Sequence, residues 1–302
     1  MTSPSRILRV VLWMTGVLLS FSTLALSIRG LAGALSIFEV LTVRTIGGLV
    51  ILLTLAAAMP ELRPSMKPRR MGLNLIRNGV HYAAQYVWAL SLTLLPLATV
   101  FALEFTMPIW LAIIAVFFLG ETMTPSRIGV VVLGFVGALI ILRPGLIAFQ
   151  PASLLVLSAA LGYAIFNALT KTLTATEKTF GIVFWMNAMQ LPMGLAGSDP
   201  SFFLKLGWAQ VPSIIGISIA GLSAHYCLAN AFRAGDATLV MPIDFLRVPL
   251  IALVGWWFFG EALDPFVFLG GAIMLTGIVW NLRDEAKKAH RLPERPVVDP
   301  VH

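Results

Sequence analysis

The chain has 302 residues and a formal net charge of +7; 58% of its residues are hydrophobic and 12% are charged. Soluble domains carry about 25% charged residues, so this composition excludes a wholly water-facing surface and indicates a polytopic membrane protein. A basic excess also fits nucleic-acid binding, but basic cytoplasmic loops of a membrane protein produce the same excess. The single cysteine, Cys227, excludes an internal disulfide and a cysteine-rich metal site.

Apolar runs close to the roughly 20 residues that a spanning helix needs follow one another along the chain. They predict an all-α membrane protein with ten transmembrane helices, near residues 7–28, 36–59, 71–94, 97–119, 126–143, 152–173, 180–197, 210–232, 236–259 and 264–282. The seventh range is the weakest, because Trp185, Asn187 and Gln190 interrupt it. The apolar core of the first range is longer than that of a signal peptide, so we expect it to stay as a span.

The Lys and Arg residues set the predicted orientation. With the N-terminus inside, fifteen of them lie in cytoplasmic segments, and three, Arg29, Arg143 and Lys205, lie on the other side. Because short cytoplasmic loops are enriched in Lys and Arg, both termini are predicted to be cytoplasmic, in a cell inner membrane, and no nucleic-acid partner is expected. The charged, proline-containing tail 285–302 is predicted to be disordered.

An internal repeat runs through this series of spans. Sliding residues 85–143 onto 225–283 without a gap leaves 12 of 59 positions identical, and it brings the acids Glu104 and Asp244 into register. Each copy also ends a span with a Gly-Glu pair before an aligned proline. These pairs are Gly120, Glu121, Gly260 and Glu261.

The repeat divides the chain into two predicted units, residues 1–145 and 146–284, with five spans in each. Five is an odd number, so the two units must cross the membrane in opposite senses. Inverted repeats of this kind place a site near the membrane midplane that opens to either side in turn. The sequence therefore predicts the architecture of a transporter that works by alternating access.

Three features together resemble a known family: ten spans as five plus five inverted, Arg44 in the second span, and Gly-Glu at the ends of spans four and nine. They are similar to the drug/metabolite transporter superfamily, in its bacterial EamA branch, over about residues 7–283. The resemblance implies a small-molecule exporter or exchanger of the inner membrane. Cargoes in this superfamily include amino acids, amines, nucleoside-like compounds, organic anions and drugs, so no particular cargo is implied.

Span three carries a polar stripe whose members recur at steps of three and four residues and therefore share one helical face. The stripe and the aromatic residues beside it are Asn74, Arg77, Asn78, His81, Tyr82, Gln85 and Trp88. An arginine at a helix centre costs about 2.5–3.5 kcal/mol on insertion scales, so this face is expected to avoid lipid. It is either the wall of a cargo cavity, which five polar residues favour, or a surface that hydrogen-bonds to neighbouring helices.

Other spans carry fewer polar residues, and four of these complete the set of predicted substrate-binding residues. They are Arg44, Tyr163, Asn167 and His225. A lone intramembrane histidine is as often a packing partner as a ligand contact, so both alternatives stay open for His225. Tyr82 and Trp88 are expected to face the cargo, whereas the other tryptophans can instead lie at the membrane interface.

The ionisable residues inside spans four and nine are predicted to have different roles. Asp244 and Arg247 are three residues apart and can pair on one helix face, so we interpret them, like the two Gly-Glu pairs, as structural or gating residues. Glu104 has no such neighbour and needs either a partner from another span or a proton. It is therefore the candidate for carrying a coupling proton. Pro108, Pro242 and Pro249 remove backbone hydrogen bonds inside these spans and are either hinges or static kinks.

Three buried arginines against two acids predict a slightly positive cavity, suited to an amino acid or a similar carboxylate-bearing metabolite. Organic anions, drugs and amines are the alternative cargoes. No protease motif or metal-ligand spacing is present, so catalysis, a metal and a cofactor are not predicted. A non-transporting membrane sensor or assembly protein is the alternative of a different class, and the inverted duplication disfavours it. The expected partners are a small molecule and the bilayer, with the chain as a monomer or homodimer.

Overall fold

The structure, a computed structural model, describes residues 4–31, 33–94, 103–104, 106–142, 151–247, 249–250, 253, 256–257 and 265–290. All regular secondary structure in these residues is helical, as predicted. The α-helices are α1 (Pro4–Leu31), α2 (Ile37–Ala58), α3 (Met71–Leu94), α5 (Met107–Leu119), α6 (Pro125–Leu142), α7 (Ser153–Thr174), α8 (Thr179–Gly197), α9 (Val211–Ala234), α10 (Ala237–Val240) and α12 (Pro265–His290). The 3-10 helices are η1 (Pro60–Met66), η2 (Phe202–Lys205), η3 (Trp208–Gln210) and η4 (Met241–Leu246).

By length and composition alone, four helical segments of the described chain are long and apolar enough to cross a bilayer. They are Arg6–Ile28, Ile37–Ala58, Ser153–Thr174 and Trp208–Ala234, which fall in the predicted spans one, two, six and eight. The chain is thus a multi-pass membrane protein. The other six predicted ranges also contain helical residues, and their crossing of the membrane remains a prediction.

The start of α2 shows how local sequence sets a helix boundary. Ser36 and Glu39 form a capping box, in which the Ser36 amide donates to Glu39 Oε2 at 2.6 Å and the Glu39 amide donates to Ser36 Oγ at 3.4 Å. Such a cap satisfies backbone donors that the helix itself cannot pair. Lys205 then donates to Glu39 Oε1 at 2.7 Å and so anchors the η2 segment to this end of α2.

The predicted ninth span is not one continuous α-helix in its described part. The short α10 gives way to η4, which has Pro242 at its beginning and contains Asp244. Proline lacks the amide hydrogen that an α-helix needs at this place, which explains the change of geometry. Interrupted membrane helices commonly supply polar groups to a transporter's midplane site.

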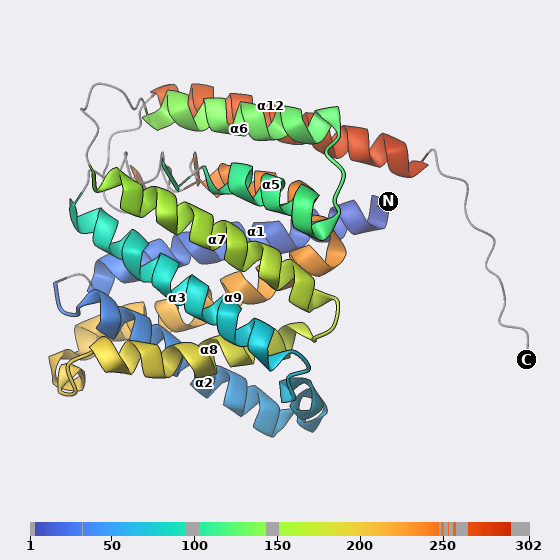
Figure 1. The fold of residues 1–302 in the computed structure, drawn as a ribbon. Coiled ribbons are helices and arrows are strands. Elements are labelled where there is room, and N and C mark those ends of the chain that lie inside the picture. Colours follow the sequence, from blue (N-terminus) through green and yellow to red (C-terminus); the bar gives the residue numbers. More distant parts are fainter. Residues whose placement is uncertain are drawn as a thin grey trace, which may run out of the picture.

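The helices pack mainly in pairs that are distant in sequence. α1 lies along α9, α3 along α7, α2 along α8, and α6 along α12. Figure 1 shows α6 and α12 side by side at one edge of the molecule and α2 and α8 at the other. Gly137 allows the close approach of α6 to α12, because a Cβ there would stand 2.7 Å from the Gly270 carbonyl oxygen.

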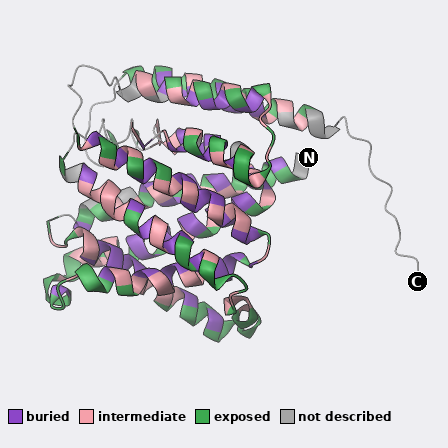
Figure 2. Ribbon diagram, in the orientation of Figure 1, coloured by how far each residue is buried: buried purple, intermediate pink, exposed green. Residues whose placement is uncertain are grey.

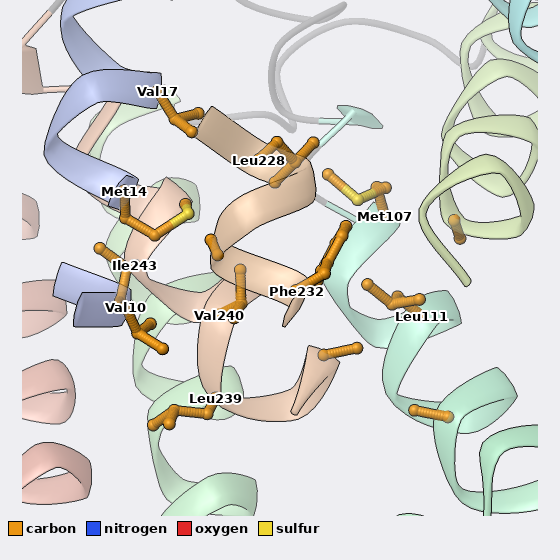
Figure 3. Close-up of a cluster of buried hydrophobic side chains, with 14 of the residues drawn as sticks. Val10, Met14, Val17, Met107, Leu111, Leu228, Phe232, Leu239, Val240 and Ile243 are labelled. Carbon is orange, nitrogen blue, oxygen red and sulfur yellow. The ribbon is translucent and has the colours of Figure 1, made fainter. Parts of the chain in front are cut away.

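A buried apolar cluster joins the two predicted units. Figure 3 shows Met14 of α1, Phe232 of α9, Ile243 of η4 and Met107 of α5 within this cluster. Because these helices come from both halves of the chain, the core is common to the two units.

The outer faces of the helices are also apolar. Figure 2 shows exposed residues along the outward sides of the helices, and Leu19, Phe117 and Leu275 are among the exposed large hydrophobic side chains. In water such a surface would favour aggregation. A bilayer solvates it, in agreement with the composition.

The structure describes only the first of the two Gly-Glu pairs. Gly120 ends α5 in the left-handed region, with φ of 66°, a conformation that glycine adopts without strain. Glu121 Oε1 accepts a hydrogen bond from the Ala237 amide at 2.8 Å and thereby ties the end of α5 to the start of α10. Gly260 and Glu261 lie outside the described residues.

Candidate functional site

A cavity of about 160 Å³ lies among α1, α2, α3, α5, α7, α9 and the η4 segment. One water molecule requires about 10–15 Å³, so the space admits a small organic group rather than a few ordered waters. Ten residues named from the sequence line it: Arg44, His81, Gln85, Trp88, Glu104, Tyr163, Asn167, His225, Asp244 and Arg247. The predicted polar residues of six different spans therefore converge on one place.

Arg44 and Gln85 line the cavity, and Gln190 contacts Arg44 without being among the lining residues. Arg44 Nη2 donates to Gln85 Oε1 at 3.1 Å and to Gln190 Oε1 at 2.9 Å. Gly221 leaves room for the arginine, because a Cβ there would be 2.7 Å from Arg44 Cδ. Among the described residues no acid forms an ion pair with Arg44, so its charge is balanced only by carboxamide dipoles. The cavity is therefore electropositive at Arg44.

Aromatic rings and imidazoles make the middle of the cavity wall. His81 stacks on Phe166 with ring centroids 4.0 Å apart, and it meets His225 edge to face at 5.0 Å. Tyr163 lies 6.0 Å from His81. Gln190 Nε2 and His81 Nδ1 are 2.7 Å apart, which fixes the orientation of the imidazole. The π-faces of such a wall suit a flat aromatic ligand.

A cluster of three charged residues, separate from Arg44 and its glutamines, also lines the cavity. Arg247 Nη2 donates to Glu104 Oε1 at 3.0 Å and lies 3.2 Å from Asp244 Oδ2. Trp88 Nε1 donates to Glu104 Oε2 at 2.8 Å. The predicted pairing of Asp244 with Arg247 is confirmed. Of the two alternatives for Glu104, a partner from another span or a proton, the structure supplies the partner. One arginine between two carboxylates leaves this cluster with an excess negative charge.

The cavity contains positions that the internal repeat relates to each other. Four pairs separated by 140 residues line it: Gln85 and His225, Trp88 and Leu228, Glu104 and Asp244, and Met107 and Arg247. Equivalent places in the two halves thus meet at one site, as a duplicated transporter requires. The residue types differ within each pair, so the two sides of the cavity are chemically different.

The N-terminal part of the polar stripe of α3, from Asn74 to Asn78, does not line the cavity. Asn74 donates to both oxygens of Glu177 at 3.0 Å, Arg77 Nε donates to Thr170 Oγ1 at 2.7 Å, and Asn78 donates to the Trp185 carbonyl at 3.3 Å. These contacts correspond to the alternative of helix–helix hydrogen bonding.

Tyr82 also lies away from the cavity. Its ring is buried and is 6.4 Å from that of Phe38. The expectation of cargo contacts for Asn74, Arg77, Asn78 and Tyr82 therefore has no support from their positions, whereas His81, Gln85 and Trp88 of the same helix do line the cavity.

The expected positive cavity needs correction, because Arg77 is not among its lining residues. Two arginines, Arg44 and Arg247, stand against two acids, Glu104 and Asp244. The formal charge of the lining is zero with neutral histidines. The charges are not evenly paired, however, because Arg44 contacts only carboxamides, whereas Arg247 contacts both acids. The cavity is polarised rather than positive.

The sequence did not single out several cavity residues. Gln190, which interrupts predicted span seven, is not a lining residue, but it is fully buried and holds the lining residues Arg44 and His81. The apolar lining consists of Val17, Phe21, Leu24, Ile28, Met107, Phe166 and Leu228. The four α1 members recur at steps of four, three and four, which is a helical face, but a lipid-facing stripe has the same pattern.

No group of three or more histidine, cysteine, aspartate or glutamate side chains stands close enough to hold a metal ion in the part of the chain that the structure describes. The polar groups of the cavity instead offer hydrogen bonds, opposite charges and aromatic faces. Such an arrangement can bind an organic molecule, and it has no nucleophile activated by a neighbouring base among its described residues.

Comparison with known proteins finds one family whose profile matches both halves of the chain. The profile of the EamA-like transporter family matches residues 8–143 and again residues 150–283. A crystal structure with 16% sequence identity shares the fold, with a TM-score of 0.77 over 97% of this chain and 100% of that chain. The two family matches divide the chain close to the predicted boundary between the repeats.

Two curated relatives extend this comparison. A riboflavin transporter of Rhizobium johnstonii is 34% identical over 212 residues, which are 68% of this chain and 68% of the relative. An S-adenosylmethionine uptake transporter of Rickettsia felis is 24% identical over 230 residues, 76% of this chain and 78% of the relative.

Proposed function

Because the chain belongs to the EamA-like transporter family, we propose that it carries a flat heteroaromatic metabolite across the membrane, with riboflavin as the first candidate cargo. Membership of the family makes it a transporter of small molecules and not an enzyme. The finer choice of cargo is supported by the cavity and by the 34% identical riboflavin transporter.

The observation that carries the proposal is a polarised cavity with an aromatic wall. Tyr163 and the side of the His81 imidazole that does not stack on Phe166 offer faces on which an isoalloxazine ring can stack, while Phe166 itself is covered by His81 and Arg77. The pyrimidine edge of a flavin presents carbonyl acceptors on either side of an N–H donor. Arg44 can donate to such carbonyls, and a glutamine oxygen released from Arg44 can accept from the N–H.

An amino acid is the second candidate, and the separation of charges in the cavity favours it. A zwitterion can direct its carboxylate to Arg44 and its ammonium to Asp244. An aromatic amino acid would also use the ring-lined wall. The carboxylate-bearing cargo expected from the sequence therefore remains a proposal beside riboflavin, with export or exchange set by the cargo gradient.

The same proposal includes the transport mechanism. Ten spans in two inverted units, 1–145 and 146–284, would expose the cavity to one side and then the other while the packed helices rock about it. Both termini and the 285–302 tail would be cytoplasmic, in an inner membrane, because of the fifteen-to-three distribution of Lys and Arg. Gly120 and Glu121, which join α5 to α10, would move as part of this transition.

Glu104 is proposed to bind a coupling proton when Arg247 turns toward Asp244 or toward the cargo. The charged and titratable groups around it are Arg247, Asp244, His81, His225 and Tyr163. Glu104→Gln keeps an acceptor for the Trp88 indole but cannot ionise. Its transport rate is therefore expected to vary less with pH than that of the wild type, and an unchanged pH profile would remove the proton role.

Uptake of labelled riboflavin into liposomes that contain the purified protein tests the proposed cargo. We expect uptake above that of protein-free liposomes, saturation with concentration, and acceleration by unlabelled riboflavin trapped inside. The same liposomes are then tested with labelled aromatic amino acids. Amino-acid uptake without riboflavin uptake would reject the first candidate in favour of the second.

A further inference from the structure

Three cavity residues carry buried polar atoms that have no hydrogen-bond partner in the described structure. The atoms are Asn167 Oδ1, His225 Nδ1 and Asp244 Oδ1, and the three residues are 4%, 7% and 5% exposed. A buried acceptor without a donor is destabilising, and native proteins nearly always supply the missing partner. The two oxygens accept hydrogen bonds only, whereas the imidazole nitrogen can do either.

Each of the two oxygen-bearing side chains is anchored through its other polar atom. Asp244 Oδ2 contacts the Arg247 guanidinium, and Asn167 Nδ2 donates to the Met107 sulfur at 3.5 Å. The repeat-related acid Glu104 differs, because both of its oxygens accept hydrogen bonds. The polar atoms that lack a hydrogen-bond partner therefore belong to Asp244, to Asn167 of α7 and to His225 of α9.

The three residues line the same cavity, and one aromatic side chain of its lining, Phe21, lies beside His225 and beside Arg247, the partner of Asp244. The ring of Phe21 lies 6.5 Å from that of His225, and the Arg247 guanidinium carbon stands 5.0 Å from the Phe21 centroid. Terminal torsions of Asn and Asp are soft, so a small rotation is enough to turn either oxygen toward a ligand. A ligand at Phe21 would then meet these acceptors beside the Arg247 guanidinium, which already contacts Glu104 and Asp244.

We propose that Asn167, His225 and Asp244 form a subsite for the hydrogen-bond-donating part of the cargo, either the hydroxyls of a polyol chain or an ammonium group. Arg44 and its glutamines take the acceptor-bearing part. This inference rests on the proposed transport function and deepens it. It makes hydroxyl or ammonium donors, and not the ring alone, a determinant of which molecules are carried.

Matched pairs of compounds separate the contribution of the donors from that of the ring. Riboflavin and lumiflavin share the isoalloxazine ring, but lumiflavin has a methyl group in place of the ribityl chain. L-Tryptophan and indole-3-propionate share the indole and the carboxylate, but the second lacks the ammonium. Binding of all four compounds to the purified protein is measured by equilibrium dialysis.

We expect the donor-bearing member of at least one pair to bind about tenfold more tightly than its matched compound, as a buried hydrogen bond to a charged group provides. Asn167→Leu and Asp244→Asn should each reduce that ratio severalfold. Asn281→Leu is the matched control, because Asn281 is also buried with a partnerless Oδ1, but it lies on α12 and is not among the cavity-lining residues. It should leave the ratio unchanged.

The outcomes distinguish this inference from the proposed cargo. If riboflavin and lumiflavin bind equally well and the tryptophan pair shows no difference either, the subsite is wrong while the flavin proposal stands. If the tryptophan pair shows the difference and riboflavin does not bind, the subsite stands and riboflavin is rejected. Equal ratios in the wild type, Asn167→Leu and Asp244→Asn, or no binding of any of the four compounds, would overturn the subsite.

Discussion

Replacing Arg247 with methionine is expected to remove most of the folded protein. The substitution leaves Glu104 and Asp244 without their cation, and both carboxylates are buried. Removing one partner of a buried ion pair destabilises by about 3–5 kcal/mol, since the remaining charge is neither paired nor hydrated. Thermal unfolding and the monodisperse yield of the purified variant in detergent measure the loss.

Two comparisons give this prediction a control. In the triple variant with Glu104→Gln and Asp244→Asn, neither of these two side chains carries a charge that needs the guanidinium, so stability should largely return while transport should not. Arg127→Met breaks an ion pair of similar length, 2.9 Å, but its carboxylate, Asp236, is 42% exposed and can be hydrated, so the loss should be smaller. An Arg247→Met protein as stable as the wild type would show that the two acids do not need the guanidinium.

Arg44→Met is expected to lower transport by about 10–100-fold per folded molecule, because it removes a charge-assisted hydrogen-bond donor from the cavity. Methionine has a similar length, but it leaves the oxygens of Gln85 and Gln190 without the donor they now share. The rate of uptake into liposomes, normalised to reconstituted protein, gives the effect.

Arg44→Lys separates the charge from the geometry. Lysine restores a positive charge without the planar fork that reaches two carboxamides at once, so we expect only partial recovery. If Arg44→Met lowers the yield of folded protein but transports normally per molecule, Arg44 acts as a structural anchor between α2, α3 and α8 and does not bind the cargo.

Much of the helical order follows from sequence, because apolar length and capping signals are local. The predicted ranges 36–59 and 71–94 differ from α2 and α3 by at most one residue at each end. The interruption at Pro242 also follows from a local rule. The packing of repeat-related positions around one cavity could be expected from the 140-residue register.

The division of the polar stripe of α3 could not be predicted. Asn74 and His81 lie on the same helical face, yet Asn74 is held by Glu177 and His81 lines the cavity. The difference depends on which neighbouring helix faces each turn. The same reason explains Glu104, whose partner Arg247 lies 143 residues away. Pairing over such a distance is a property of the folded state and leaves no local pattern.

The sequence could not assign the apolar stripe of α1 to the cavity, for a related reason. Phe21 and Leu24 form a helical stripe of apolar residues, and Leu19 on the same helix is exposed. In a membrane both the inward and the outward side of a helix are apolar, so hydrophobic periodicity does not tell them apart. Only the packing of α1 along α9 assigns the stripe to the cavity.

Protection of a cysteine placed at Leu24 tests most directly whether this cavity is the route of the cargo. Leu24→Cys is made together with Cys227→Ala, and the rate of its reaction with a maleimide is followed in liposomes with and without riboflavin. Leu19→Cys, on the outward side of α1, is the matched control. We predict that riboflavin slows the labelling of Leu24→Cys and leaves that of Leu19→Cys unchanged. Riboflavin transport with equal labelling of Leu24→Cys in its presence and absence would contradict a cargo route through this cavity.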